Sequence, residues 1–227
     1  MDEFMSESEQ WELVKRWIRE NAIWIVGGVV LGVLALAGWR FWLERVERLA
    51  LEASGRYEQA LDAFARGDLT RGYAIVDDLR RDHDTSPYAS QADLLAARMH
   101  VDAREYDKAA ERLTRVMRDS GDAELATIAR GRLARVRLEQ GRPDDALALL
   151  KDARAGAFAP QFDEIRGDAL LARGDKAQAL SAYRAARAGA ADGIVDPGLL
   201  DLKIVAIEPA AASAPPAAAT PPAKKVD

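Results

Sequence analysis

Cysteine is absent from this 227-residue sequence, and histidine occurs only twice. Without cysteine the chain has no disulfides, no thiolate nucleophile, no cysteine zinc site and no lipid-modified N-terminal cysteine. The sequence also lacks an HExxH pair, a nucleophile elbow and a Walker-type glycine loop. We therefore predict that the protein is not an enzyme and that it has no catalytic residues, bound metal or cofactor.

A surplus of basic residues is missing too, because the formal net charge is -5. Sequence-independent binding to nucleic acid needs a concentrated excess of Lys and Arg, so no nucleic acid is expected among the partners. Aromatic residues make up only 7% of the chain. The sequence is rich in Ala, Leu, Arg, Asp and Glu, a mixture that favours helices. An all-α protein is predicted.

One long segment carries no charge. Residues 22–39 read AIWIVGGVVLGVLALAGW, and as a helix they rise about 27 Å, close to the roughly 30 Å of a hydrocarbon core. Arg40 can extend its guanidinium toward the headgroups, so the buried stretch can continue to residue 43. Trp24, Trp39 and Trp42 lie where interfacial indoles are expected. We predict a single N-terminal transmembrane helix over residues 22–43.

Two other interpretations of this segment stay open. It could be a buried core helix, or a signal peptide cleaved after the small-x-small triplet Ala35-Leu36-Ala37. The acidic 21-residue lead-in and the Trp residues at both rims favour an uncleaved anchor. Basic residues are balanced on the two sides of the span, so charge counting does not predict the orientation.

Gly28 and Gly32 form a GxxxG step within the span. Such a step lets a second transmembrane helix approach closely, and we name both residues as a helix-contact site. The alternative is that glycine is simply common in membrane helices. The stretch from Glu44 to Leu49 has no Pro or Gly, so the helix is expected to continue into water.

Small residues recur at a nearly constant spacing in the remaining chain. Successive copies are separated by 37, 37 and 33 residues, at Ala60, Ala97, Ala134 and Gly167, and a second small residue follows each copy twelve positions later, at Gly72, Ala109, Ala146 and Ala179. The spacing predicts four helical hairpins, with a break at residues 67–68, 104–105, 141–142 and 174–175. Leu95, Met99, Leu113 and Val116 are predicted core residues.

These hairpins resemble the tetratricopeptide repeat, most closely in Arg166–Lys176 followed by Ala179, Tyr183 and Ala186. The large aromatics expected early in the first helix of a repeat are missing, with Asp93 and Arg130 in that register. The apolar stripe should therefore lie about one position away. The resemblance implies a solenoid of about four degenerate repeats over residues 44–207, with a concave face lined by first helices.

The end of the chain divides into two parts. Residues 196–205 predict a short helix that caps the last repeat. Residues 208–227 alternate Pro and Ala with little else, which predicts a disordered tail.

Few polar residues suggest a site. Arg98 and Arg135 occupy equivalent places on two first helices and are predicted to face a partner groove, where they could hold carboxylates. The alternative is ordinary solvated arginine. Asp82-His83-Asp84 could hold a metal, but we expect a solvated turn between repeats. His100 is expected to pack within the repeats.

The order of the parts is similar to that of the YfgM family. It comprises an acidic N-terminus with Val14-Lys15-Arg16, a span ending in Gly38-Trp39-Arg40-Phe41-Trp42, and degenerate repeats containing Leu133-Ala134-Arg135-Val136. The resemblance implies an ancillary subunit of the SecYEG translocon in the bacterial inner membrane, acting with a PpiD-like chaperone on secreted polypeptides. It also implies a cytoplasmic segment over residues 1–21 and a periplasmic repeat domain. The Pro/Ala tail departs from the family pattern. The alternative is an anchored adaptor or regulator of another cell-envelope protein complex.

Overall fold

The computed structural model describes residues 7–151, 153, 155–190 and 193–208. Within these residues all regular structure is helical, which confirms the predicted all-α class. The chain divides into two units, residues 1–55 and residues 56–227. The predicted tail lies outside the described residues, except for Glu208.

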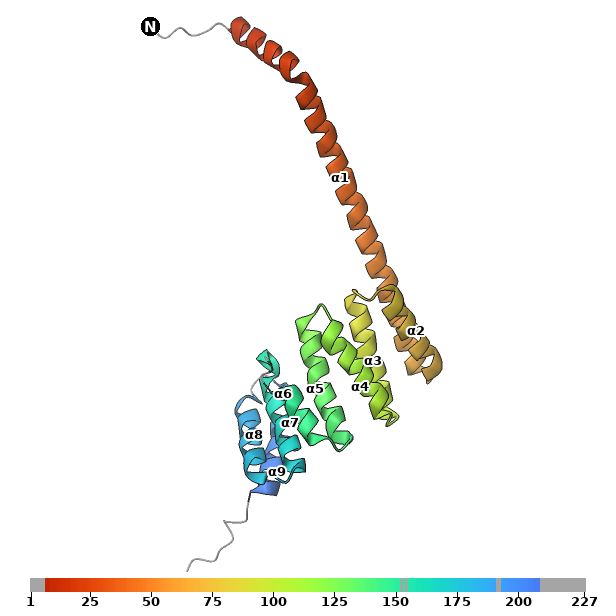
Figure 1. The fold of residues 1–227 in the computed structure, drawn as a ribbon, viewed down its shortest axis with the longest axis vertical. Coiled ribbons are helices and arrows are strands. Elements are labelled where there is room, and N and C mark those ends of the chain that lie inside the picture. Colours follow the sequence, from red (N-terminus) through yellow and green to blue (C-terminus); the bar gives the residue numbers. More distant parts are fainter. Residues whose placement is uncertain (1–6, 152, 154, 191–192, 209–227) are drawn as a thin grey trace, which may run out of the picture. The chain divides into compact units, whose positions relative to one another are not determined.

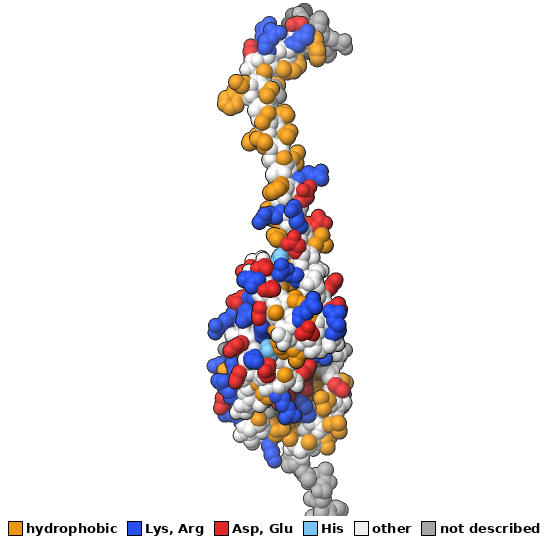
Figure 2. Space-filling view, turned by 90° about the vertical axis from the view of Figure 1, so that its right-hand side faces the viewer, with side chains coloured by type: hydrophobic (Ala, Val, Ile, Leu, Met, Phe, Trp, Pro, Cys, Tyr) orange, Lys and Arg blue, Asp and Glu red, His pale blue; other side chains and the backbone are white. Residues whose placement is uncertain are grey.

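The first unit consists of most of helix α1, Glu7–Ala65, whose 59 residues make it the longest of the described helices. An 18-residue window within Val26–Ala65 has a mean hydropathy of 1.7, and none of it is buried. Trp24, for example, is 80% exposed. Figure 2 shows charged side chains on both sides of an uncharged section of this helix. By length and composition, α1 is the one described helix able to cross a membrane, and its exposure does not fit a buried core helix.

Helix α1 continues without a break past Glu44, as expected from the absence of Pro and Gly there. Its last ten residues, 56–65, belong to the second unit and form the first helix of the first hairpin. The chain therefore passes from the anchor into the first hairpin without an intervening loop.

Four hairpins follow one another in the second unit (Figure 1). The end of α1 pairs with α2, and the three later hairpins each consist of two complete helices. The bounds are α2 Leu69–Asp82, α3 Pro87–Asp102, α4 Tyr106–Asp119, α5 Ala123–Glu139, α6 Pro143–Leu150, α7 Ala159–Ala172 and α8 Lys176–Ala188, with a short 3₁₀ turn, η1 Gly156–Phe158, before α7. The predicted solenoid of four hairpins is confirmed.

All four predicted breaks are turns with a residue in the left-handed region. Gly67, Gly141 and Gly174 have φ angles of 77°, 70° and 87°. Arg104 has a φ of 57° at the equivalent place in the second hairpin, the only non-glycine residue with positive φ among those described. Asp68 and Asp175, which follow two of the glycines, accept backbone hydrogen bonds at the starts of α2 and α8. A residue with positive φ therefore closes the turn of each hairpin. In the second hairpin this residue is Arg104, for which the conformation is unfavourable because it has a side chain.

The small residues of the repeat are buried at both registers. Ala60, Ala134, Ala109, Ala146 and Ala179 are fully inaccessible, and Ala97 is 1% exposed. Because these side chains are short, the two helices of a hairpin can approach closely. Leu113 and Val116 are core residues as predicted. Leu95 and Met99 are only half-buried, and this part of the prediction is wrong: α3 turns Leu94 rather than Leu95 toward the core.

Helix α9, Pro197–Ile207, is the predicted cap. Leu200 is fully buried against the cluster that contains Tyr183 and Ala186 of α8. Lys203 reaches α7, where its Nζ donates to Glu164 at 2.8 Å and to Asp168 at 2.7 Å. The cap is therefore attached to the last hairpin by both an apolar and a charged contact.

Candidate functional site: an arginine-lined groove

A groove opens between α3 and α5, the first helices of the second and third hairpins. Its volume is about 640 Å³. Its lining residues come from α3, α4 and α5, and comprise Ala97, Arg98, Val101, Tyr106, Leu113, Arg132, Arg135, Val136 and Glu139. Ala97 lies in the buried small register, so the groove is built on the contact that pairs α3 with α4.

The floor of this groove is apolar. Leu113 and Val136 belong to the core cluster that joins the second and third hairpins, and Val101 packs against the same cluster. The floor is therefore rigid, because its side chains are fixed by neighbours in two hairpins.

Three arginines line the groove beside this apolar floor. Arg98 comes from α3, and Arg132 and Arg135 come from α5, three residues apart and on one helix face. Burial lowers the pKa of Arg132, and the positive charges of Arg98 and Arg135 lower it further. Arg132 is nevertheless exposed, so solvent screens much of this repulsion.

Arg98 and Arg135 each lie near a carboxylate. Arg98 lies 4.0 Å from Asp102, one turn along α3, and Arg135 lies 3.3 Å from Glu164 of α7. Arg132 forms no ion pair with any carboxylate in the part of the chain that the structure describes. The Arg98 contact is longer than a hydrogen bond and Arg135 donates once to Glu164, so all three guanidiniums retain N–H donors.

The two ends of the groove carry charges of opposite sign. Glu139 lies seven residues after Arg132 on α5, a rise of roughly 10 Å along the helix. The Tyr106 hydroxyl donates to Glu139 Oε2 at 3.4 Å, which orients that carboxylate. One end of the groove is therefore basic and the other acidic.

The structure places Arg98 and Arg135 in this one groove, and it adds Arg132, which the sequence analysis did not single out. The signal for Arg132 was its spacing of three from Arg135, but only the position of Arg98 on α3 shows that all three charges converge. At Gly28 and Gly32 an added Cβ would meet no described atom within 4 Å. That face of α1 is open to a neighbour.

The turn predicted between repeats at Asp82-His83-Asp84 is present, but His83 itself is not solvated. His83 is buried, with 9% exposure, and it ends α2. Its N–H donates to the Leu79 carbonyl, and its own carbonyl accepts from the N–H of Ser86, each at 2.9 Å. Asp82 and Asp84 are exposed. No group of three His, Cys, Asp or Glu side chains able to hold a metal is found among the residues described.

His100 packs within the repeats, as predicted. Its ring stacks on Tyr73 of α2 with centroids 4.2 Å apart, and its Nδ1 lies 2.7 Å from Glu105 Oε2. This stack joins the first hairpin to the second.

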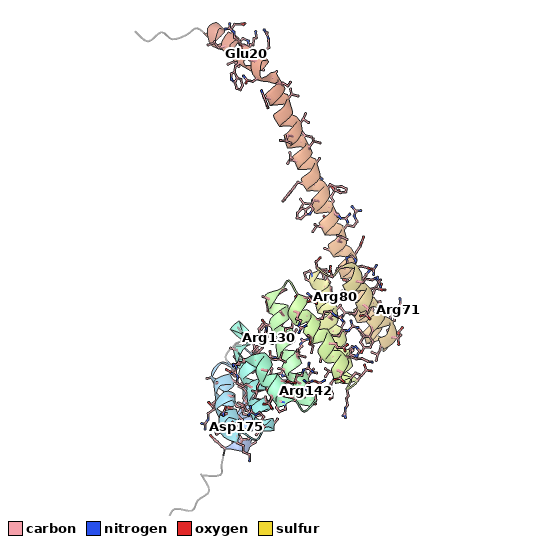
Figure 3. The ribbon with its side chains drawn as sticks, in the orientation of Figure 1. Glu20, Arg71, Arg80, Arg130, Arg142 and Asp175 are labelled. Atoms are coloured by element: carbon pink, nitrogen blue, oxygen red, sulfur yellow. The ribbon has the colours of Figure 1, made fainter. Side chains whose placement is uncertain are left out.

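Asp93 is the least expected polar residue of the core, with no exposed surface. Arg112 and Arg115 of α4 donate to its Oδ1 at 3.1 and 3.4 Å. Arg80, which Figure 3 labels on α2, lies 3.9 Å from its Oδ2. Burial raises the pKa of Asp93 above its ordinary value, although Arg115 and Arg112 act in the opposite direction. Asp93 therefore connects α2, α3 and α4 through charged contacts.

Comparison with known proteins identifies the architecture. The family model described as "Tetratricopeptide repeat-like domain" matches residues 15–208. In fold, the chain is similar to two solved structures of MamA. A double mutant of MamA RS-1 is 13% identical, with a TM-score of 0.50 over 68% of this chain and 92% of that one. MamA 41-end from Desulfovibrio magneticus RS-1 is 14% identical, with a TM-score of 0.50 over 71% and 97%. At these identities the likeness shows the fold alone.

Curated relatives are similar to this chain over most of its length. The protein named "Ancillary SecYEG translocon subunit" from Escherichia coli (strain K12) is 35% identical over 82% of this chain and 89% of its own length. The proteins of the same name from Aggregatibacter actinomycetemcomitans and Neisseria gonorrhoeae are 28% and 26% identical, each over 88% of this chain. The chain belongs to this family of ancillary SecYEG translocon subunits, the YfgM family, with a tetratricopeptide repeat-like domain.

Proposed function

We propose that this protein is a membrane-anchored scaffold that binds other proteins as an ancillary subunit of the SecYEG translocon. It acts with a PpiD-like periplasmic chaperone in handling secreted polypeptides, and its role requires no catalysis. The observation that supports this most is the open arginine-lined groove on a rigid array of hairpins. Relatives over most of the chain carry the name of a translocon subunit.

The anchor of the proposed scaffold comprises residues 22–43. Residues 1–21 are cytoplasmic, and the repeat domain, residues 44–207, is periplasmic. The exposed apolar section of α1 supports the span, since unpaired apolar surface of this length is unfavourable in water.

Gly28 and Gly32 form the contact surface of the span. Both lie on one helix face, and neither has a described neighbour within 4 Å of its added Cβ position. Replacing them with leucine would therefore leave α1 itself intact while blocking close approach by another transmembrane helix.

The test is affinity purification of the full-length protein from gently solubilised membranes, followed by mass spectrometry. Recovery of translocon and PpiD-like subunits, reduced in Gly28→Leu and Gly32→Leu, is the expected result. Gly38→Leu is the matched control, because Gly38 lies in the same span but off the GxxxG face. A reproducible partner set without secretion components would instead make the protein an adaptor of another envelope complex.

Topology is tested separately by protease treatment of spheroplasts that carry full-length protein with an N-terminal tag. Digestion of the repeat domain from outside, with a protected tagged fragment that includes residues 1–43, is the expected result. A mature protein that lacks the first 37 residues, the end of the Ala35-Leu36-Ala37 triplet, would identify a cleaved signal peptide and contradict the anchor.

A further inference from the structure

We propose that residues 11–20 of α1 lie flat in the interface between lipid and water, where their apolar face binds the surface of the phospholipid bilayer. This inference rests on the proposed function in one respect, that residues 22–43 form the membrane anchor. It adds a second membrane contact, of a different kind, directly before the span.

The residues of this segment separate completely into two faces. Successive residues of a helix are offset by roughly 100°, so the apolar side chains fall within roughly 160° of the circumference and the charged ones within roughly 140° on the opposite side. The apolar face consists of Trp11, Leu13, Val14, Trp17 and Ile18, and the charged face consists of Glu12, Lys15, Arg16, Arg19 and Glu20. The segment is therefore amphipathic, whereas residues 22–39 are uncharged on every side.

This apolar face is exposed. Trp11 and Trp17 are each 60% exposed, and the three aliphatic side chains of the face are exposed as well. A contiguous apolar face of this kind is unfavourable in water. Residue 22, where the span begins, follows Ile18 after only four positions, and the whole segment is roughly 15 Å long. The bilayer surface is therefore within reach of all of it.

The composition of the face favours a lipid surface over a second helix. Trp11 and Trp17 carry indoles, whose N–H groups can stay among the headgroups while the rings are buried. Paired helices meet through a narrow apolar stripe, whereas a face this broad suits a bilayer surface, into which it sinks by about 5–10 Å.

The charged face carries an excess of basic residues. Lys15 Nζ lies 5.6 Å from the centre of the Trp11 ring, so its ammonium is close to the edge of the apolar face and can extend to a lipid phosphate. Three basic residues against two acidic ones leave the segment with a formal charge of +1. Because this excess is small, the apolar face supplies most of the attraction, and the segment should bind zwitterionic as well as anionic bilayers.

Lying flat requires α1 to bend where the segment meets the span. Figure 3 shows α1 changing direction near the labelled Glu20. The next residue, Asn21, donates from Nδ2 to the Trp17 carbonyl at 2.9 Å. A side chain that bonds the carbonyl four positions earlier competes with the helix hydrogen bonds, and such competition is one cause of helix bending. The chain therefore has a bend at the required place.

The absence of cysteine allows a nitroxide spin label to be attached at one chosen residue of the full-length protein. Four single variants place the label alternately on the charged and the apolar face: Glu12→Cys, Val14→Cys, Arg16→Cys and Ile18→Cys. In vesicles of phosphatidylethanolamine and phosphatidylglycerol, power saturation measures collisions of the label with oxygen, which concentrates in hydrocarbon, and with a nickel chelate, which stays in water. The ratio of oxygen to nickel collisions should be severalfold higher at positions 14 and 18 than at positions 12 and 16.

Two results of this scan would overturn the proposal. A ratio that rises steadily from position 12 to position 18 would show a helix that stands upright in water. Low collision rates with both reagents at positions 14 and 18 would show that the face is buried against a second copy of the protein.

Substitutions test whether the apolar face holds the segment in place. With the label at position 18, Trp11→Ser together with Trp17→Ser should lower the ratio. Glu12→Gln together with Glu20→Gln is the matched control, because it changes only the charged face, and it should leave the ratio high. An equal fall in both double variants, or loss of the alternation in vesicles of phosphatidylcholine alone, would contradict binding through the apolar face.

A label at Val30→Cys tests the anchor on which the inference rests. Val30 lies within the span, so its label should collide with oxygen far more often than with nickel. If it does and the alternation over positions 12–18 is missing, the interfacial inference fails while the anchor stands. If nickel reaches the label at position 30, the anchor itself fails.

Discussion

A Cβ added to Gly167 of α7 would lie 2.4 Å from Cε1 of the Tyr183 ring of α8. Tyr183 is itself 1% exposed, and its hydroxyl donates to Asp168 at 2.7 Å, so the ring is fixed in place. Glycine at position 167 is therefore required by the ring, since real side chains do not approach so closely.

The first hairpin shows the same relationship with the two helices exchanged, because the ring lies on its first helix and the glycine on its second. A Cβ on Gly72 of α2 would lie 2.5 Å from Cε1 of Phe64, at the end of α1. In each case the aromatic residue stands four positions after the small residue of its own helix. The second and third hairpins have alanine at both small positions and Leu113 or Leu150 four positions later. Hairpin geometry thus allows alanine opposite an aliphatic residue and glycine opposite a ring.

This relationship predicts that Gly167→Ala changes the stability in opposite directions with and without the Tyr183 ring. Gly167→Ala should destabilise the protein, because overpacking costs about 1 to 3 kcal/mol and exceeds the gain in helix propensity of about 1 kcal/mol. In the Tyr183→Leu background the same change should stabilise it, since the ring is gone. Urea unfolding of the full-length protein in detergent measures both differences. Equal effects of Gly167→Ala in the two backgrounds would refute the rule.

The repeat register predicts a second result. Ala146 and Ala179 are fully buried between paired helices, so replacing either with Phe should overpack its hairpin and cost about 1 to 3 kcal/mol. Ala185→Phe is the control, because Ala185 lies on α8 but is exposed. Unchanged thermal unfolding in both buried variants would show that the register is wrong.

Arg104 offers a stabilising substitution. Its φ of 57° is unfavourable for a residue with a side chain, and the other three hairpins have glycine at this place. Arg104→Gly should therefore raise the free energy of unfolding by up to about 1 kcal/mol. Gly141→Arg makes the reverse change in the third hairpin and should lower it. Urea midpoints that move in the opposite directions would contradict this account of the turn.

Alkaline pH should weaken the C-terminal cap. Burial and the hydrogen bond to Asp168 raise the pKa of Tyr183 above its ordinary 10.0. Burial lowers the pKa of Lys203, but its hydrogen bonds to Asp168 and Glu164 outweigh this and raise it above 10.5. Above these ordinary values the unfolded chain releases protons that the folded protein retains, so stability present at neutral pH is lost as pH rises.

The measurement for this prediction is urea unfolding at neutral pH and above pH 10.5, the ordinary lysine value. Stability should fall between the two, and the fall should be smaller in Tyr183→Phe and in Lys203→Met. A decline of the same size in both variants would show that neither group is responsible.

The hairpins and their turns could be predicted from the sequence because they depend on local rules. Helix pairing requires small residues at a fixed spacing, and turn closure requires glycine followed by a capping residue. Even Arg104 was placed correctly, since the spacing fixed the break where the glycine was missing.

Residues whose role depends on three helices could not be predicted in this way. Asp93 is buried because arginines from α2 and α4 surround it, and nothing within α3 reveals that environment. Arg132 joins the groove because α3 brings Arg98 beside it. Each of these positions depends on contacts between elements distant in sequence.

The central claim is that the groove of an anchored repeat domain binds proteins of the secretion pathway. It is tested most directly by photo-crosslinking in living cells, with a photoreactive amino acid replacing Val101 on the groove floor or Ala74 on the exposed surface of α2. The account predicts adducts with secreted polypeptides or a periplasmic chaperone from position 101 and not from position 74. Identical adducts from both positions, or none from position 101, would contradict it.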